Sequence, residues 1–189
     1  MDNTKTLEQE KAELNTLINK GITFEITDAE SREKRMFFGL IKKYVPVKAT
    51  KQFNIRELTL GTLDRLSVEW IEFAIDEAAL KSGDGMQQAR TLACEHALRC
   101  AKIIALAVMD ADFLIPQCGR DGIVRYVEDT HRLKELTALF ARTVKPSQLY
   151  RLTMLINAMC NLGDFVNSIR LMCTHRTTMP VRIEANSEG

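Results

Sequence analysis

The residues that could hold a pair of metal ions are few and scattered along the chain. Glu128 and His131 form one Glu-x-x-His pair. A di-metal carboxylate site in a helical bundle needs two such pairs, and the second is missing because Ala93 stands three residues before His96. The sequence therefore does not predict a di-metal centre, and we expect His131 to lie at a helix edge with a local hydrogen bond.

Cysteine, histidine and aspartate are also poorly spaced for zinc binding or nucleophilic catalysis. His96 and Cys100 would share a helical face, but Cys94 would point elsewhere and a fourth ligand is missing. The five cysteines form no Cys-x-x-Cys pair, so we expect them to be buried free thiols in a reducing compartment. Asp110 and Asp112 are expected to be solvated, and no nucleophile-elbow or phosphate-binding glycine motif occurs. These observations predict a protein that is not an enzyme and has no cofactor or metal.

Composition and charge narrow the class of protein further. The chain has 189 residues, of which 46% are hydrophobic, and 26 Lys and Arg against 25 Asp and Glu give a net charge of +1. This size and apolar content predict one folded domain with a real core. The balanced charge predicts no nucleic-acid partner. The densest basic cluster is interpreted as a strand edge guarded by lysines, with phosphate contact as the alternative; it comprises Lys42, Lys43, Lys48 and Lys51.

The sequence also bears on compartment. The N-terminus, MDNTKTLEQEK, has mixed charge and no apolar run, which is not typical of a signal peptide. The longest strongly apolar run without charge, 103–109, is far shorter than the roughly 20 residues needed to cross a bilayer. We therefore expect a soluble protein in the cytoplasm of the cell that makes it, with no membrane partner.

The chain divides into three parts with different patterns. Residues 1–60 predict a small N-terminal α+β region, residues 61–175 a helical bundle, and residues 176–189 an extended tail. The predicted fold class is therefore mainly α, a four-helix-type bundle with a small β-containing part at its N-terminus.

Within the first part, Gly21 is expected to end a short helix over residues 7–19. Alternation of apolar and polar residues predicts strands at 22–26 and 53–58. The apolar stretch 36–47, which Pro46 ends, fits either a helix or a buried strand.

Four helices are predicted for the second part, over residues 63–80, 86–113, 121–145 and 146–175. The second half of the helix at 86–113 is apolar nearly all round, which is typical of the middle of a bundle. The last helix carries apolar residues at alternating spacings of three and four over three heptads, and this seam is expected to pack inside the bundle, with self-association or a partner helix as the alternative. The seam comprises Leu152, Leu155, Met159, Leu162, Val166, Ile169 and Cys173.

Charge is unevenly distributed over these helices. Residues 64–77 carry five acids and one base, whereas residues 142–170 carry four bases and one acid. The two segments could pair within the bundle or between subunits, but two solvated faces are the expected outcome, because exposed charge pairs contribute little stability.

Two segments carry a resemblance to a known family. Residues 51–67 read KQFNIRELTLGTLDRLS, a strand followed by "LTLGTLDRLS" and an acidic helix, and residues 163–172 read GDFVNSIRLM. Together with the overall architecture, they resemble tail assembly chaperones of tailed bacteriophages and prophages. Residues 1–50 and the C-terminal tail lie outside the resemblance.

The resemblance implies a non-enzymatic role in the cytoplasm of a bacterial host. Such chaperones bind the tape measure protein, keep its apolar helices from aggregating, and help to bring tail tube subunits to it. Methionine side chains adapt their shape, so they suit a surface that binds varied amphipathic helices. The candidate partner-binding residues are Met154, Met159, Leu162, Phe165 and Met172. All five could instead be core residues. The alternative functions are a structural virion component, such as a head–tail connector or tail accessory subunit, and a cytosolic enzyme with an unrecognised site.

Overall fold

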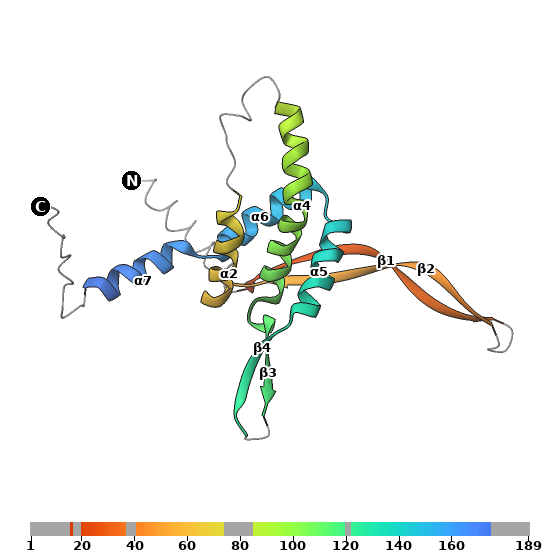
Figure 1. The fold of residues 1–189 in the computed structure, drawn as a ribbon, viewed down its shortest axis with the longest axis horizontal. Coiled ribbons are helices and arrows are strands. Elements are labelled where there is room, and N and C mark those ends of the chain that lie inside the picture. The colour runs from red at the N-terminus through yellow and green to blue at the C-terminus, as the bar shows by residue number, and fades with distance from the viewer. Residues whose placement is uncertain (1–15, 17–19, 37–40, 74–84, 120–121, 175–189) are drawn as a thin grey trace, which may run out of the picture.

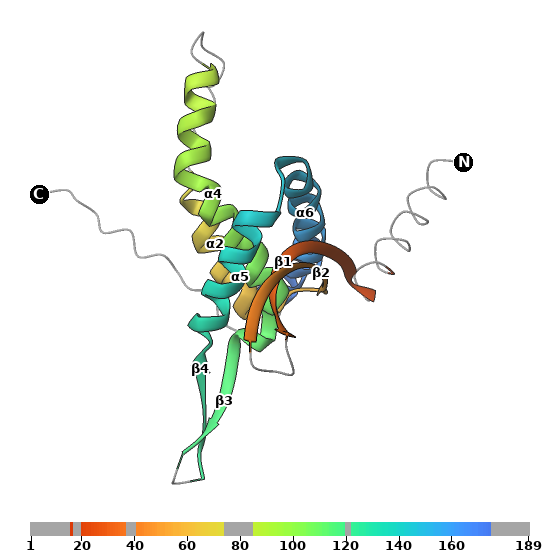
Figure 2. The same ribbon diagram turned by 90° about the vertical axis from the view of Figure 1, so that its right-hand side faces the viewer.

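The structure, a computed structural model, describes residues 16, 20–36, 41–73, 85–119 and 122–174. These residues form an α+β fold in which helices pack around a common core and two antiparallel hairpins project from it (Figures 1 and 2). Along the chain the elements are β1 (Ile22–Met36), β2 (Ile41–Ile55), α2 (Leu60–Ile71), α4 (Gly85–Met109), the 3₁₀ helix η1 (Asp110–Phe113), β3 (Leu114–Cys118), β4 (Val124–Glu128), α5 (Thr130–Thr143), α6 (Pro146–Met159) and α7 (Leu162–Thr174).

The core is built around the second half of α4. This half includes Ile104 and Met109, each 1% exposed, and α4 contacts α2, α5, α6 and β2. The first half of α4 extends beyond the other helices (Figure 2). The prediction that the apolar second half lies in the middle of the helices is confirmed.

Strands β1 and β2 form a long antiparallel hairpin. The register places Ile22 opposite Ile55 at the base and Met36 opposite Ile41 at the far end. The ambiguous stretch 36–47 is therefore strand wherever it is described. Pro46 does not end it but lies within β2, opposite Ser31. A two-stranded ribbon tolerates proline because each strand has an edge without a ladder partner.

The base of this hairpin is fixed to the helices. The rings of Phe24 and Phe53 lie 6.2 and 5.1 Å from the ring of Phe140 on α5. Nearby, the Arg142 guanidinium donates to both carboxylate oxygens of Asp28, with Nε 3.1 Å from Oδ1. The hydrogen bond from Arg142 holds the pKa of the Asp28 carboxyl below its usual value. Aromatic packing and a two-pronged ion pair therefore hold β1 against α5.

Two predicted helices are shorter in the structure, one before and one after the second hairpin. The helix predicted for 86–113 ends at Met109, and β3 follows η1. The helix predicted for 121–145 begins only at Thr130, because Asp129 accepts a hydrogen bond from the backbone N–H of Arg132 and caps it. The preceding Val124–Glu128 pairs with β3, as suits its two valines and tyrosine. Glu128 and His131 therefore lie on different elements and cannot share a helical face.

Helix α2 begins at Leu60 and ends at Ile71. Glu69 on α2 and Glu72 just after it pair with Arg99 of α4, and Glu69 also pairs with Lys102. These two acids of the segment therefore pair with α4, an arrangement that neither solvated faces nor pairing with the last helix had predicted. The rest of the helix predicted for 63–80 lies mainly outside the described residues, as do the predicted helix over 7–19 and the tail 176–189.

Candidate partner-binding surface

The predicted last helix is interrupted, which corrects the expectation of one helix over 146–175. Helix α6 ends at Met159, and α7 begins at Leu162. Between them Asn161 has a φ of 44°, a left-handed conformation that asparagine tolerates better than most residues. Its side-chain amide donates to Glu57 Oε1 at 2.8 Å and to Asp164 Oδ2 at 3.0 Å. These hydrogen bonds fix a change of direction that divides the heptad seam.

The α6 half of the seam belongs to the core. Of its seam residues, Leu152 is 5% exposed, Met159 is fully buried and Leu155 is partly buried. Ile156, beside the seam, is 1% exposed. Pro146 opens the helix, and Gln148 Oε1 accepts a hydrogen bond from the Lys145 backbone N–H at 3.0 Å. The expectation that the seam packs inside the helices is therefore confirmed for this half.

Helix α7 has the same kind of pattern but buries none of its residues. Five of its apolar side chains recur at spacings of three and four and occupy about 120° of the helix circumference, counted at about 100° per residue. Their exposed fractions range from 39% to 69%. We call this surface the α7 face; it comprises Leu162, Phe165, Val166, Ile169 and Met172. For this half of the seam, the expectation of internal packing is wrong.

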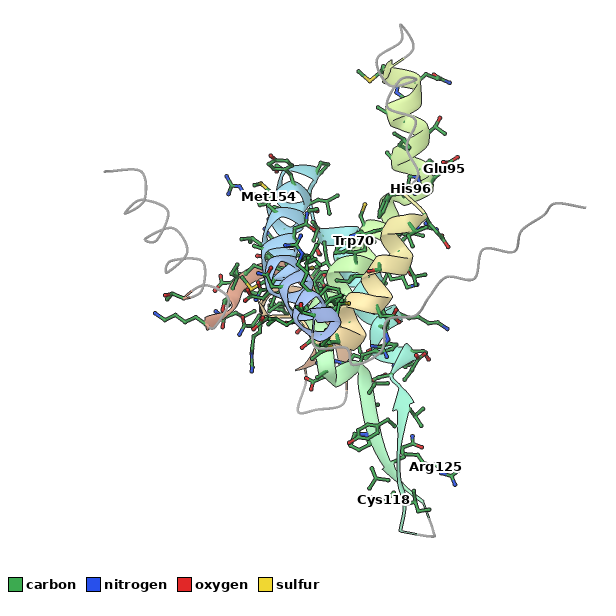
Figure 3. All side chains as sticks on the ribbon, turned by 90° about the vertical axis from the view of Figure 1, so that its left-hand side faces the viewer. Trp70, Glu95, His96, Cys118, Arg125 and Met154 are labelled. Atoms are coloured by element: carbon green, nitrogen blue, oxygen red, sulfur yellow. The ribbon has the colours of Figure 1, made fainter. Side chains whose placement is uncertain are left out.

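The five candidate partner-binding residues thus fall into three positions. Leu162, Phe165 and Met172 lie on the α7 face. Met154 lies on α6, is 58% exposed, and is separated from α7 by the helix break (Figure 3). Met159 is buried in the core and is not available to a partner in this structure. The sequence analysis placed Val166 and Ile169 in the seam but not among the candidate partner-binding residues. Their exposure follows from the helix break at Asn161, which the apolar spacing did not predict.

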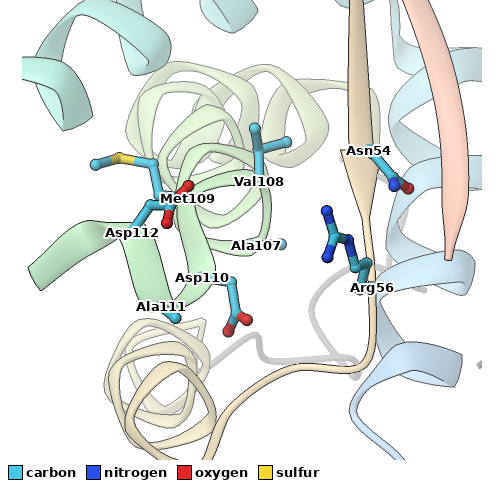
Figure 4. Close-up of a pocket in the computed structure, with 8 residues that line it drawn as sticks. All are labelled: Asn54, Arg56, Ala107, Val108, Met109, Asp110, Ala111 and Asp112. Atoms are coloured by element: carbon cyan, nitrogen blue, oxygen red, sulfur yellow. The ribbon is translucent and has the colours of Figure 1, made fainter. Parts of the chain in front are cut away.

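A pocket of about 180 Å³ lies where β2 approaches the end of α4 (Figure 4). Asn54 and Arg56 line it from the strand side, and residues 107–112 line it from the helix side. Asp110, with a φ of 41°, was expected to be solvated. Its Oδ1 instead accepts hydrogen bonds from the Thr59 backbone N–H at 2.9 Å and from the Thr59 hydroxyl at 3.0 Å, at the start of α2. Asp110 therefore has a structural role in joining α2 to the end of α4.

The cysteines correct the expectation of buried thiols. Cys94, Cys118 and Cys173 are exposed, Cys100 is partly buried, and Cys160 is buried. Burial raises the pKa of the Cys160 thiol to about 11 and also raises the pKa of Cys100. The exposed cysteines lie on the protruding half of α4, on β3 and on α7, the elements whose packing the sequence predicted least well.

The histidines lie apart from one another. His131 is exposed on the first turn of α5, with Nδ1 3.7 Å from Glu135 Oε2, which agrees with the expected helix-edge position. The His96 ring lies 5.0 Å from the Phe73 ring, and its Nδ1 is buried without a hydrogen-bond partner. Across the described ranges, no three histidine, cysteine, aspartate or glutamate residues gather as a metal site would require.

No known protein family, curated protein or solved structure matches the chain. In the part of the chain that the structure describes, no helix combines the length and apolar character needed to span a membrane.

Proposed function

We propose that this protein is a non-enzymatic assembly chaperone of phage-tail type, working in the cytoplasm of a bacterial host. Its helical body, a four-helix-type bundle in this proposal, would carry α7 as the element that binds apolar helices of a tape measure protein. The observation that supports this role is the α7 face, a continuous apolar stripe on a helix without a buried residue.

The chemistry of the α7 face suits an amphipathic helical partner. A stripe about 120° wide matches the apolar side of a second helix, and the two can pack side by side. Each of its five side chains is roughly half exposed, so covering them would contribute about 1 kcal/mol per side chain before the cost of association. Phe165 supplies a large rigid surface and Met172 an adaptable one, which together would tolerate partners of varied sequence.

The β3–β4 hairpin favours a second candidate function, a structural virion component. Its strands carry exposed apolar side chains on both faces, including Ile115 opposite Val127 and Tyr126 opposite Pro116. A ribbon with apolar residues on both faces suits permanent insertion between neighbouring subunits better than transient contact.

The two functions differ in where the protein ends up. The chain would be co-expressed with an apolar helical segment of a phage tape measure protein, and the recovery of that segment in the soluble fraction would be measured. The chaperone proposal predicts co-purification and absence from finished particles. A chain present at a fixed stoichiometry in purified particles would overturn it in favour of the structural role.

A matched pair of variants on α7 tests the surface. Ile169→Ser changes the α7 face, whereas Leu171→Ser changes an apolar residue that is 62% exposed on the opposite side of the same helix. We expect the first to reduce capture of the segment about tenfold and the second to leave it unchanged. Equal losses, or no co-purification with the unaltered chain, would contradict the proposal.

A further inference from the structure

The distal half of the β1–β2 hairpin is strongly positive, although the net charge of the whole chain is close to zero. We call residues 31–36 and 41–48 the basic arm; they extend away from the helices (Figure 1). The basic arm holds six Lys and Arg and one Glu, so its net charge is +5. Since the whole chain carries +1, the remaining residues together carry −4.

Strand pairing creates this concentration. The register places Lys34 opposite Lys43 and, one position further out, Arg35 opposite Lys42. Directly opposite residues share a face of a ribbon, and neighbouring positions along a strand alternate between faces. Each face of the ribbon therefore carries one pair of like charges.

Such pairs are costly in a free ribbon. Like charges directly opposite each other destabilise strand pairing, and a two-stranded hairpin is only marginally stable without packing on one face. Charged side chains protect a strand edge from aggregation, but that protection does not require like charges directly opposite each other. Two like-charged pairs, one on each face, therefore call for an explanation beyond edge protection, and an anionic partner supplies it.

The spacing of the charges matches duplex DNA. Two successive pairs span about 7 Å at about 3.4 Å per residue, so this length carries four positive charges. Duplex DNA presents one negative charge per about 1.7 Å of axis, or about four over the same length. A two-stranded ribbon also fits the major groove, where phosphates flank it on both sides. A flat acidic protein surface would meet only one face of the ribbon.

From this placement we propose that the basic arm docks onto duplex DNA through the phosphate backbone, without base specificity. The proposal is independent of the α7 face and of the chaperone function. It differs from the expectation, based on net charge, that the protein has no nucleic-acid partner, and the experiment below decides between the two. The sequence suggested only half of the site, because residues 32–35 come close to residues 42–48 only through pairing of the strands.

The test uses the full chain and a fluorescent 24-base-pair DNA duplex of arbitrary sequence, with binding followed by anisotropy from 50 to 300 mM salt. About four phosphate contacts predict a slope near −4 for log K against log salt concentration. The variant Lys42→Glu with Lys43→Glu should weaken binding at least tenfold at 50 mM salt and reduce the slope by about two. It should still fold, because it converts both like-charged pairs into opposite-charged pairs.

The matched control is Arg132→Glu with Lys134→Glu, which makes the same charge change on exposed residues in the first turns of α5. This control should bind DNA within about twofold of the unaltered chain. Absence of DNA binding at 50 mM salt, or equal weakening by both double variants, would overturn the proposal. Polyglutamate or anionic phospholipid vesicles serve as competitors; tighter arm-dependent binding to either would also overturn it and assign the arm to an acidic protein or a membrane surface.

Discussion

Helices α6 and α7 are neighbours of nearly equal length with similar apolar spacing, yet one is part of the core and the other is uncovered. On α6 the core residue Ile156 is 1% exposed, whereas on α7 the seam residue Ile169 is 43% exposed. The difference arises at Asn161, where the chain changes direction before α7 can continue along α4. Apolar periodicity therefore predicts that a helix has an apolar face, but it does not predict whether that face packs in the protein's own core or stays exposed for a partner.

The first prediction compares the same substitution on the two helices. Ile156→Ala should lower the free energy of unfolding by about 2–5 kcal/mol, because it leaves a cavity beside α4 that the core closes only in part. Ile169→Ala should change it by less than about 0.5 kcal/mol, because the side chain leaves solvent only when a partner binds. Urea unfolding followed by circular dichroism measures both. Similar losses at the two sites would mean that α7 is covered within the free protein.

The cysteines provide a second comparison of the same residue type on either side of the break. Cys160 is buried and its pKa is raised to about 11, so only about one thiol in a thousand is ionised at pH 8. Cys173 is exposed on α7. Iodoacetamide at pH 8 should therefore modify Cys173 at least about 100-fold faster than Cys160, as measured by peptide mass spectrometry over time.

The pH dependence sharpens that result. Because thiolate is the reacting form and the pKa of Cys160 is raised, labelling of Cys160 should keep rising with pH up to about 11. Urea at a denaturing concentration should bring the two rates together. Slow labelling of Cys173 in the native protein would show that α7 is covered in solution.

The sequence predicted most of the helical core, because apolar residues at helical spacing are buried in the structure. The apolar second half of α4 and the buried residues of α6 repeat at helical spacing and pack where that spacing predicts. Alternation predicted the strand at 22–26, which is the start of β1, and the part of the strand at 53–58 up to Ile55, where β2 ends; residues 56–58 are not strand. Phe24 and Phe53 pack together on Phe140. These elements were predictable because their local pattern and their packing agree.

The remaining differences arise where a local signal was weak or a long-range contact decided the structure. Strand β4 replaced the start of the helix predicted for 121–145, since Asp129 caps α5 only at Thr130, and η1 replaced the last turn of the helix predicted for 86–113. The break at Asn161 depends on its hydrogen bond to Glu57, which is 104 residues away along the chain. The α7 face and the basic arm therefore became visible only in three dimensions.

A third prediction tests what maintains the break between α6 and α7. Asn161→Ala should lower the free energy of unfolding by about 1–2 kcal/mol, because alanine resists a positive φ and cannot donate to Glu57. Asn161→Gly keeps the backbone freedom and loses only the hydrogen bonds, so it should cost roughly half as much. Urea unfolding distinguishes the two variants. If alanine is tolerated as well as glycine, the left-handed conformation does not set the break.

The smallest effect is expected at the start of α7. Asp164 lies in its first turn, where its carboxylate accepts a hydrogen bond from Asn161 and interacts favourably with the positive end of the helix dipole. Asp164→Ala should therefore reduce the stability of α7 by about 0.5 kcal/mol. Because α7 buries no residues, the loss should remain local: amide hydrogen exchange should accelerate about twofold along α7 and stay unchanged along α6. Equal acceleration in both helices would show that they open together, and that the core extends across Asn161 despite the exposure of the α7 face.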